Sequence, residues 1–364
     1  MRQFRVRSPT FLLGVWAILW FLGLSGSAQV PPGLSVQLSN GYARLQVSGD
    51  LGTACTVQYW NGLSPTNTWQ FLTNLTPLAR SPSVVIDPSP AIAPRFYRAF
   101  AQRIPTNILT TNMVWIAPGT FVMGSPSSEV LRQADETQHP VTLTQGFFMN
   151  KYLVTQGQYL SVVNTNPSYF TTNNGYSLDL NRPVERVSWN DATNFCGRFT
   201  TQQRVAGRIP TNWVYRLPTE SEWEYTCRAG TTNAFNFGKA IHGGMANFYD
   251  YYEYDSSVGD VYVANPAVPY LVRTSTVGSY SANAWGLYDM HGNLWDWCRD
   301  WYGDYPQGSV TDPQGPPTGS ARVLRGGSWS DYGRDCRAAV RAVSYPTQTN
   351  ILIGFRVVLA GGSP

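Results

Sequence analysis

The chain has 364 residues, of which 13% are charged and 14% are aromatic, and its formal net charge is +4. An average soluble chain carries about 25% charged residues. This composition therefore excludes a coiled coil, a disordered chain and a lysine-rich nucleic-acid-binding protein. The basic residues are 24 arginines and only two lysines, Lys151 and Lys239. We expect an aromatic-rich globular protein with more than one domain, because domains usually have about 100–200 residues.

The N-terminus has the pattern of a secretory signal peptide over residues 1–28. Three arginines precede an apolar run at residues 11–24, and small residues ending at Ala28 follow that run. The run is shorter than the about 20 apolar residues that cross a bilayer, and an uncleaved N-terminal anchor is the alternative interpretation. We therefore expect a secreted, periplasmic or cell-surface protein with no stable membrane span after cleavage.

Cleavage after Ala28 also changes the charge of the chain. It removes three arginines and no acidic residue, which lowers the net charge from +4 to +1. A nearly neutral chain lacks the positive field that attracts a phosphate backbone, so nucleic acid is excluded as a partner.

Residues 31–103 are predicted to form a small all-β domain of the sandwich type, and residues 104–112 a linker. Two runs of alternating apolar and polar residues, at 34–39 and 42–47, flank Asn40-Gly41, a pair typical of a two-residue hairpin turn. Further short strands are predicted at 69–72, 84–87 and 95–100. This region contains no catalytic group of residues, which favours an adhesion or spacer module.

Three helices are predicted in the rest of the chain. The first begins after Thr155, and the second begins after Ser188 and has an apolar stripe that starts at Ala192. The third begins with the capping box at Thr219 and ends at Gly230. The remaining residues show no long periodicity and are dense in Gly, Asn, Tyr and Trp, so we expect much irregular backbone.

Several motifs follow one another in residues 113–361: GTFVMGS at 119–125, RLPTESEWEY at 216–225, GLYDMHGNLWDW at 286–297, RVLRGGSW at 322–329 and GFR at 354–356. In this order they resemble the formylglycine-generating enzyme family, also called the sulfatase-modifying factor family. The resemblance implies an α+β fold of the C-type-lectin-like kind with little regular secondary structure.

The family's oxidase converts a substrate cysteine to formylglycine with O2, at a copper(I) ion held by two cysteines five residues apart. The resemblance places Cys336 at the second cysteine position and Asp331 at the first. Copper(I) prefers thiolates to carboxylates, so Asp331 argues against copper and against formylglycine generation.

Other residues of the family's catalytic pocket are retained. Ser328 and Trp295 match residues that line it, so the resemblance gives Cys336, Ser328 and Trp295 as candidate catalytic residues. The alternatives are structural: a core position for Trp295, a turn for Ser328, and a disulfide or buried thiol for Cys336.

The resemblance also implies structural calcium. The ligand positions of one family site fall on Asp289, Gly292, Leu294 and Asp296. A second family site begins with Asn247 and the carbonyl of Phe248, and Asp255 and Asp260 are candidates for its later ligands. Calcium takes several oxygen ligands, which such loops can supply. The alternative is that Asp289 and Asp296 cap turns.

The cysteine count is odd. Export permits disulfides, but five cysteines leave at least one thiol unpaired within the chain. Cys196 and Cys227 match half-cystines of the family, but their usual partner positions hold Val357 and Arg341. Cys298 or Cys336 are alternative partners, and the sequence does not decide between them.

Two classes of function are compatible with these residues. The first is an exported, non-catalytic protein that binds an unidentified protein or glycan, with aromatic side chains as a contact surface. The second is an enzyme, either a formylglycine-generating oxidase that activates sulfatases or a divergent metal-dependent oxidase that uses Cys336. This surface is expected near five aromatic residues, most of which should themselves be core residues: Trp295, Trp297, Trp329, Tyr332 and Tyr345.

A third interpretation is a binding protein diversified by a retroelement. Some targets of such elements resemble this fold and vary between the Gly-Gly-Ser and Gly-Phe-Arg motifs. Residues 330–353 occupy that place in this chain.

Overall fold

The computed structural model describes residues 112–264 and 270–361, together with the backbone of the strands that lie between residues 16 and 103. The chain divides into two compact units, one formed mostly by Met1–Ile108 and one mostly by Phe121–Pro364. Within the described residues, no helix has the length and apolar character needed to cross a membrane.

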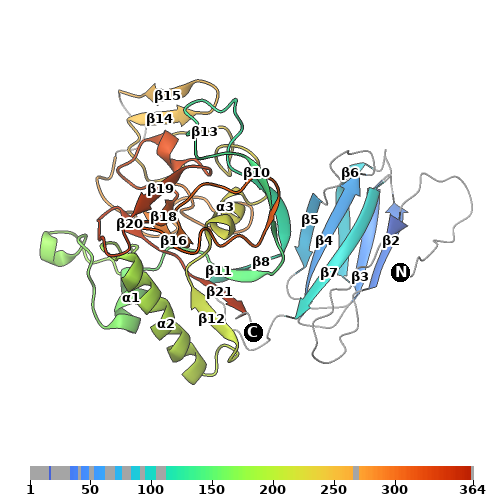
Figure 1. The fold of residues 1–364 in the computed structure, drawn as a ribbon, viewed down its shortest axis with the longest axis horizontal. Helices are drawn as coiled ribbons and strands as arrows, with labels where there is room; N and C mark the ends of the chain where they lie inside the picture. The colour runs from blue at the N-terminus through green and yellow to red at the C-terminus, as the bar shows by residue number, and fades with distance from the viewer. Residues whose placement is uncertain are drawn as a thin grey trace, which may run out of the picture. The chain divides into compact units, whose positions relative to one another are not determined.

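The first unit is built from β-strands (Figure 1). One sheet has the order β2-β3-β6 and the other the order β1-β7-β4-β5. Ser39 pairs with Tyr42, which confirms the predicted hairpin, and the strands predicted at 69–72, 84–87 and 95–100 fall on β5, β6 and β7. The strands are β1 (Trp16–Ala17), β2 (Gly33–Ser39), β3 (Tyr42–Ser48), β4 (Thr53–Asn61), β5 (Gln70–Leu75), β6 (Ser83–Pro90) and β7 (Arg95–Arg103).

Two sequence predictions reach beyond the described part of this unit. The predicted signal peptide contributes β1, which pairs in parallel with β7, and its other residues lie outside the described residues. Residues 104–111 of the predicted linker also lie outside them.

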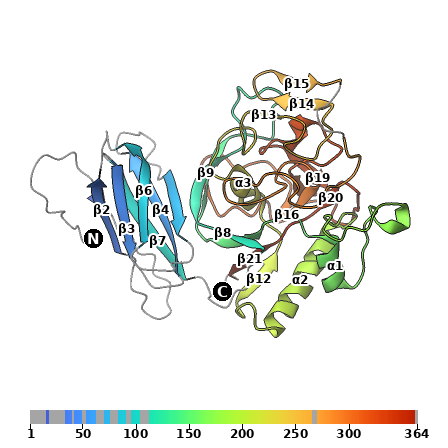
Figure 2. The ribbon, with the colours of Figure 1, turned by 180° about the vertical axis from the view of Figure 1, so that it is seen from behind.

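Four small sheets form the framework of the second unit (Figure 2). Their orders are β17-β10-β9, β12-β21-β11-β8, β13-β14-β15 and β19-β18-β16-β20. The strands are β8 (Met113–Ile116), β9 (Gly119–Met123), β10 (His139–Leu143), β11 (Phe147–Asn150), β12 (Trp213–Arg216), β13 (Ala240–Ile241), β14 (Tyr252–Asp255), β15 (Gly259–Tyr262), β16 (Trp295–Trp301), β17 (Val310–Thr311), β18 (Arg322–Arg325), β19 (Arg341–Ser344), β20 (Ile353–Gly354) and β21 (Val358–Gly361).

The three predicted helices are confirmed as α1 (Gln156–Val163), α2 (Trp189–Val205) and α3 (Glu220–Arg228). Each begins with a capping box, at Thr155, Ser188 and Thr219. The third helix ends before the predicted Gly230, because Ala229 already adopts a left-handed conformation with φ 46°. Two 3-10 turns, η1 (Thr172–Asn174) and η2 (Gly333–Cys336), complete the helical structure of the described residues. These elements confirm the predicted α+β fold.

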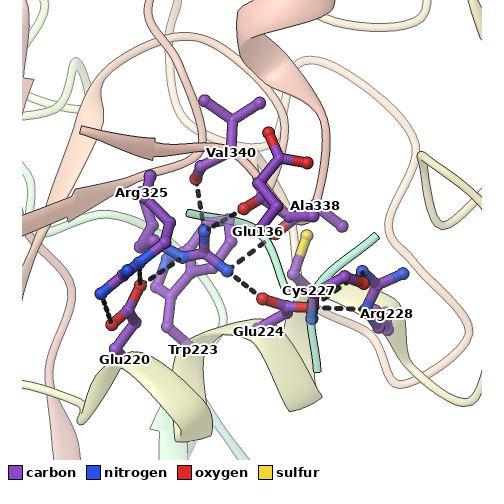
Figure 3. A network of polar contacts seen from close by, with 12 residues as sticks. Glu136, Glu220, Trp223, Glu224, Cys227, Arg228, Arg325, Ala338 and Val340 are labelled. Atoms are coloured by element: carbon purple, nitrogen blue, oxygen red, sulfur yellow. Dashed lines mark hydrogen bonds and ion pairs between the residues drawn. The ribbon is translucent and has the colours of Figure 1, made fainter. Parts of the chain in front are cut away.

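Helix α3 lies at the centre of the second unit, and all nine of its residues are buried. Its charged side chains therefore need partners, because an unpaired buried charge is strongly destabilising. Arg325 of β18 pairs with Glu224 and also donates to the carbonyl of Ala338 at 2.9 Å (Figure 3). Arg341 of β19 pairs with Glu220 at 2.7 Å. This buried network fixes the chain on both sides of η2.

Candidate functional site

The Gly-Gly-Ser turn after β18 brings the predicted site residues close to Cys336. Gly326 and Gly327 both have positive φ, 99° and 76°, which favours glycine. A Cβ on Gly327 would lie 2.6 Å from the sulfur of Cys336. Only glycine at this position allows the turn to pack against η2.

Asp331 lies at the centre of this site. Its Oδ2 accepts hydrogen bonds from the backbone N–H of Ser328 at 2.9 Å, from the Ser328 hydroxyl at 2.5 Å, and from Nε1 of Trp295 at 2.8 Å. The structure thus brings two of the three predicted catalytic residues together around Asp331. All three donors are neutral, and burial raises the pKa of the Asp331 carboxyl.

Cys336 is fully buried in an apolar cluster with Phe235, Phe248 and Tyr254. Burial raises the pKa of its thiol well above the usual value, and the nearby carboxylates of Asp331 and Asp335 raise it further. The thiolate is the metal-binding form of cysteine. The surroundings of Cys336 therefore suppress the form that copper(I) would require.

The three tryptophans named for the contact surface belong to the core. Trp295, Trp297 and Trp329 are buried, which confirms the expectation that most of these aromatic residues are core residues and leaves the tryptophans no part in a surface platform. Trp295 uses its indole N–H for Asp331, and Trp297 donates to the carbonyl of Val187 at 3.0 Å. Tyr345 is exposed, as expected.

The loop of the first predicted calcium site contains two buried aspartates. Asp296 accepts hydrogen bonds through Oδ2 from Nε1 of Trp223 at 2.9 Å and from Nε of Arg356 at 2.7 Å, but its buried Oδ1 has no partner among the described residues. Asp289 accepts through Oδ2 from the N–H of Gly278 at 2.8 Å. Burial raises the pKa of Asp289 to about 6, and the charge of Asp296 contributes to this rise.

This donor set is compatible with calcium. The partnerless Oδ1 of Asp296 and the carboxylate of Asp289 are hard oxygens. The described residues hold no group of three or more His, Cys, Asp or Glu side chains arranged for a metal, so an ion here would also need carbonyl oxygens, which the resemblance places at Gly292 and Leu294.

The residues of the second predicted calcium site lie beside this loop. The carbonyl of Asn247 accepts the N–H of Asn293 at 2.7 Å, and a Cβ on Gly292 would lie 2.3 Å from that carbonyl oxygen. Phe248 is buried next to Asn247. Of the candidate later ligands, Asp255 accepts from the N–H of Ser257 at 2.7 Å, and Asp260 pairs with Arg334 at 2.6 Å.

Four of the five cysteines belong to the described side chains, and none of them forms a disulfide. Cys196, Cys227, Cys298 and Cys336 are all free and buried. The proposed recruitment of Cys298 or Cys336 as a disulfide partner for Cys196 or Cys227 is therefore not observed. The side chain of Cys55 lies outside the described residues.

Residues 99–360 match a family model described as the sulfatase-modifying factor enzyme 1-like domain. The chain is 30% identical over 295 residues to the serine/threonine-protein kinase pkn1 of Chlamydia caviae, with 73% of this chain and 40% of that protein covered. It is 36% identical over 185 residues to the formylglycine-generating enzyme of Streptomyces coelicolor, with 48% and 52% covered. The chain thus spans about half the length, or less, of these relatives.

Two solved structures share the fold of the second unit. PvdO from Pseudomonas aeruginosa aligns with a TM-score of 0.54 and 29% identity, over 68% of this chain and 94% of that protein. Treponema denticola variable protein 1 aligns with a TM-score of 0.54 and 25% identity, also over 68% and 94%.

Proposed function

Because the chain belongs to the sulfatase-modifying factor enzyme 1-like family, we propose that it is an exported, non-catalytic binding protein of that family. In this proposal residues 1–28 are a signal peptide, residues 31–103 a spacer or adhesion module, and residues 113–361 the binding domain. The observation that carries the proposal is the environment of Asp331, which stands where the family's copper site has its first cysteine.

The residues at this site do not fit copper(I). A two-coordinate copper(I) centre needs two soft ligands, and Asp331 offers a hard carboxylate whose Oδ2 already accepts three hydrogen bonds. The remaining cysteine, Cys336, is buried and has a raised thiol pKa. These observations disfavour the alternative, a formylglycine-generating or other metal-dependent oxidase that uses Cys336.

Calcium has a structural role in this proposal. Asp289 and Asp296 would hold the ion together with carbonyl oxygens of Gly292 and Leu294, and Asn247 and the Phe248 carbonyl would begin a second site. A bound cation offsets the buried negative charge and orders a loop in which Asp289, Gly292 and Asn293 all have positive φ. It supplies no chemistry for turnover.

An oxygen-consumption assay tests the proposed function. The purified protein is loaded with copper(I) under reducing conditions and mixed with a cysteine-containing sulfatase peptide, and we expect neither stoichiometric copper nor oxygen uptake. Turnover that Cys336→Ala abolishes would overturn the proposal and establish an oxidase. The formylglycine-generating enzyme of Streptomyces coelicolor serves as the positive control.

A variable binding protein is a second candidate, favoured by the structural similarity to Treponema denticola variable protein 1. Residues 330–353 include an exposed stretch around Tyr345 that could vary without disturbing the core. Sequencing this locus in sibling isolates tests the idea. An invariant segment with no template repeat nearby rules it out.

A further inference from the structure

Five tyrosines lie together beside Asp331, and we call them the tyrosine cluster. Tyr252 and Tyr332 stack with ring centroids 4.3 Å apart, and Tyr249 stacks on Tyr332 at 5.8 Å. Tyr270 contacts Tyr249 edge-on at 4.9 Å, and Tyr262 lies 5.4 Å from Tyr252. Tyr262 is exposed and the other four are half-buried, so solvent reaches a surface made of aromatic rings.

The cluster is joined directly to the candidate site. Tyr252 lies on β14 and Tyr262 on β15, Tyr332 precedes η2, and the other two tyrosines lie in loops. Strands β14 and β15 both pack against η2. The backbone N–H of Tyr249 donates to the carbonyl oxygen of Asp331 at 2.8 Å. The backbones of Tyr249 and Asp331 are therefore joined directly.

Among the described residues, no cation pairs with either of two carboxylates near the cluster, those of Asp331 and Asp250. Asp331 has only the neutral donors of Ser328 and Trp295. Asp250 is 5% exposed, and its Oδ1 has no partner among the described residues. Both charges act on the hydroxyl of Tyr270, whose pKa is raised by burial and by these neighbours. The two residues also adjoin the cluster in the chain, because Asp250 follows Tyr249 and Asp331 precedes Tyr332.

An arginine of the protein itself shows what such a surface accepts. The guanidinium carbon of Arg334 lies 5.0 Å from the ring centroid of Tyr332, and its Nη1 is 2.6 Å from Asp260. A ring and a carboxylate thus hold one cation between them. Arg334 neutralises Asp260 and approaches Asp335 at 3.8 Å, which leaves Asp250 and Asp331 without a matching charge in the described part of the chain.

We propose that the tyrosine cluster, with Asp250 and Asp331, binds an arginine or lysine side chain in an exposed basic segment of a partner protein. The rings supply cation–π attraction and the two carboxylates supply the opposite charge. A neutral glycan could stack on the same rings, but it would leave both carboxylates unmatched. This inference names the ligand class of the binding role proposed above and rests on it.

The test is a fluorescence-polarisation titration of the full chain with a labelled arginine-containing peptide and a matched citrulline peptide. Citrulline keeps the shape of arginine and removes its charge. We expect the arginine peptide to bind about tenfold more tightly, since hydrogen bonds that involve charged groups are roughly twice as strong. Binding should weaken as salt is added.

Variants locate the binding site. Asp331→Asn should weaken the arginine peptide about tenfold, because the amide keeps the hydrogen bonds to Ser328 and Trp295 but removes the charge. Asp304→Asn, at an exposed acid outside the cluster, is the matched control and should leave binding unchanged. Tyr332→Leu removes one ring of the cluster and should lower the affinity for the arginine peptide about threefold.

Two results would overturn the inference. One is equal binding of the arginine and citrulline peptides to the parent protein, a comparison that does not depend on any variant folding. The other is binding of a neutral chito-oligosaccharide that Tyr332→Leu weakens and Asp331→Asn does not. Either result would overturn the ligand inference alone, because the protein would still bind no copper and consume no oxygen. Failure of the proposed function would instead appear as oxygen consumption in the turnover assay.

Discussion

Two regions of the second unit differ in whether arginine side chains neutralise their buried carboxylates. In the buried network around α3, burial alone would raise the pKa of Glu220, yet Arg341 and Arg325 hold it below its usual value. At the tyrosine cluster, burial raises the pKa values of Asp250 and Asp331, and no arginine in the described part of the chain offsets this. The charges of the network belong to the fold, whereas those at the cluster cost stability and point to a ligand.

The strongest test of this contrast removes a cation from the network. Arg325→Met leaves Glu220 without one cation and Glu224 with only Arg228, deep in the core. We expect a loss of about 3–5 kcal/mol in the free energy of unfolding, measured with urea. Arg334→Met, at a half-exposed ion pair, is the matched control and should lose about 1 kcal/mol or less. Equal losses would remove the distinction between the two regions.

Calcium removal is the next largest effect. When the free calcium concentration is about one hundred times the dissociation constant, binding adds about 2.7 kcal/mol to the free energy of unfolding. A chelator should therefore lower the melting temperature. Asp296→Asn should abolish the response to calcium, whereas Asp304→Asn should retain it. A melting temperature that neither chelator nor added calcium changes would contradict a calcium site at Asp289 and Asp296.

A third buried carboxylate, that of Glu185, also lacks a cation among the described residues, and it should make the stability of the protein depend on pH. Its Oε1 accepts two backbone N–H groups, but Oε2 has no partner among the described residues, and burial raises its pKa to about 7. The folded protein binds this proton more tightly than the unfolded chain does, so stability is lost as the pH rises through 7. From pH 5 to 8 the loss should be about 2 kcal/mol in urea unfolding.

Glu185→Gln serves as the control for this loss. The amide oxygen can accept the same two N–H groups, and the side chain does not ionise. The variant should therefore lose about 2 kcal/mol less stability than the parent protein between pH 5 and 8. Parallel stability curves for the two proteins would contradict the assignment to Glu185.

The smallest expected effect is on Asp331 itself. Asp331→Asn should change the free energy of unfolding by less than about 1 kcal/mol, because an amide oxygen can accept the same hydrogen bonds. A loss as large as that of Arg325→Met would place Asp331 among the structural charges of the fold. The free energies of unfolding of Asp331→Asn and Arg325→Met are compared by thermal and urea unfolding in the same buffer.

The sequence predicts the parts of the structure that depend on local signals. Capping residues at Thr155, Ser188 and Thr219 locate all three helices, and Asn40-Gly41 locates the hairpin. Trp295, Ser328 and Cys336 come from distant or irregular segments, and the family motifs alone place them at one site. The hydrogen bond from Trp295 to Asp331 could not be predicted, because the two residues are 36 positions apart.

Other features depend on long-range packing and could not be predicted from the sequence. The buried network joins Arg325 to Glu224, which is 101 residues away. One signal was present, since 24 arginines against two lysines is typical of buried ion pairs, which guanidinium groups suit best. The sequence indicated that most of the aromatic residues are core residues, but not that Tyr252 and Tyr262 belong to the aromatic surface.

A copper(I) titration of the parent protein and of Asp331→Cys tests the central claim most directly. In the proposed match to the family's copper site, the variant supplies a thiol at position 331, whereas the parent protein has only one thiol at the two matching positions, that of the buried Cys336. We predict that the parent protein binds no stoichiometric copper(I) in competition with a chromogenic chelator and that Asp331→Cys gains a site. Tight stoichiometric binding by the parent protein, lost in Cys336→Ala, would contradict the account.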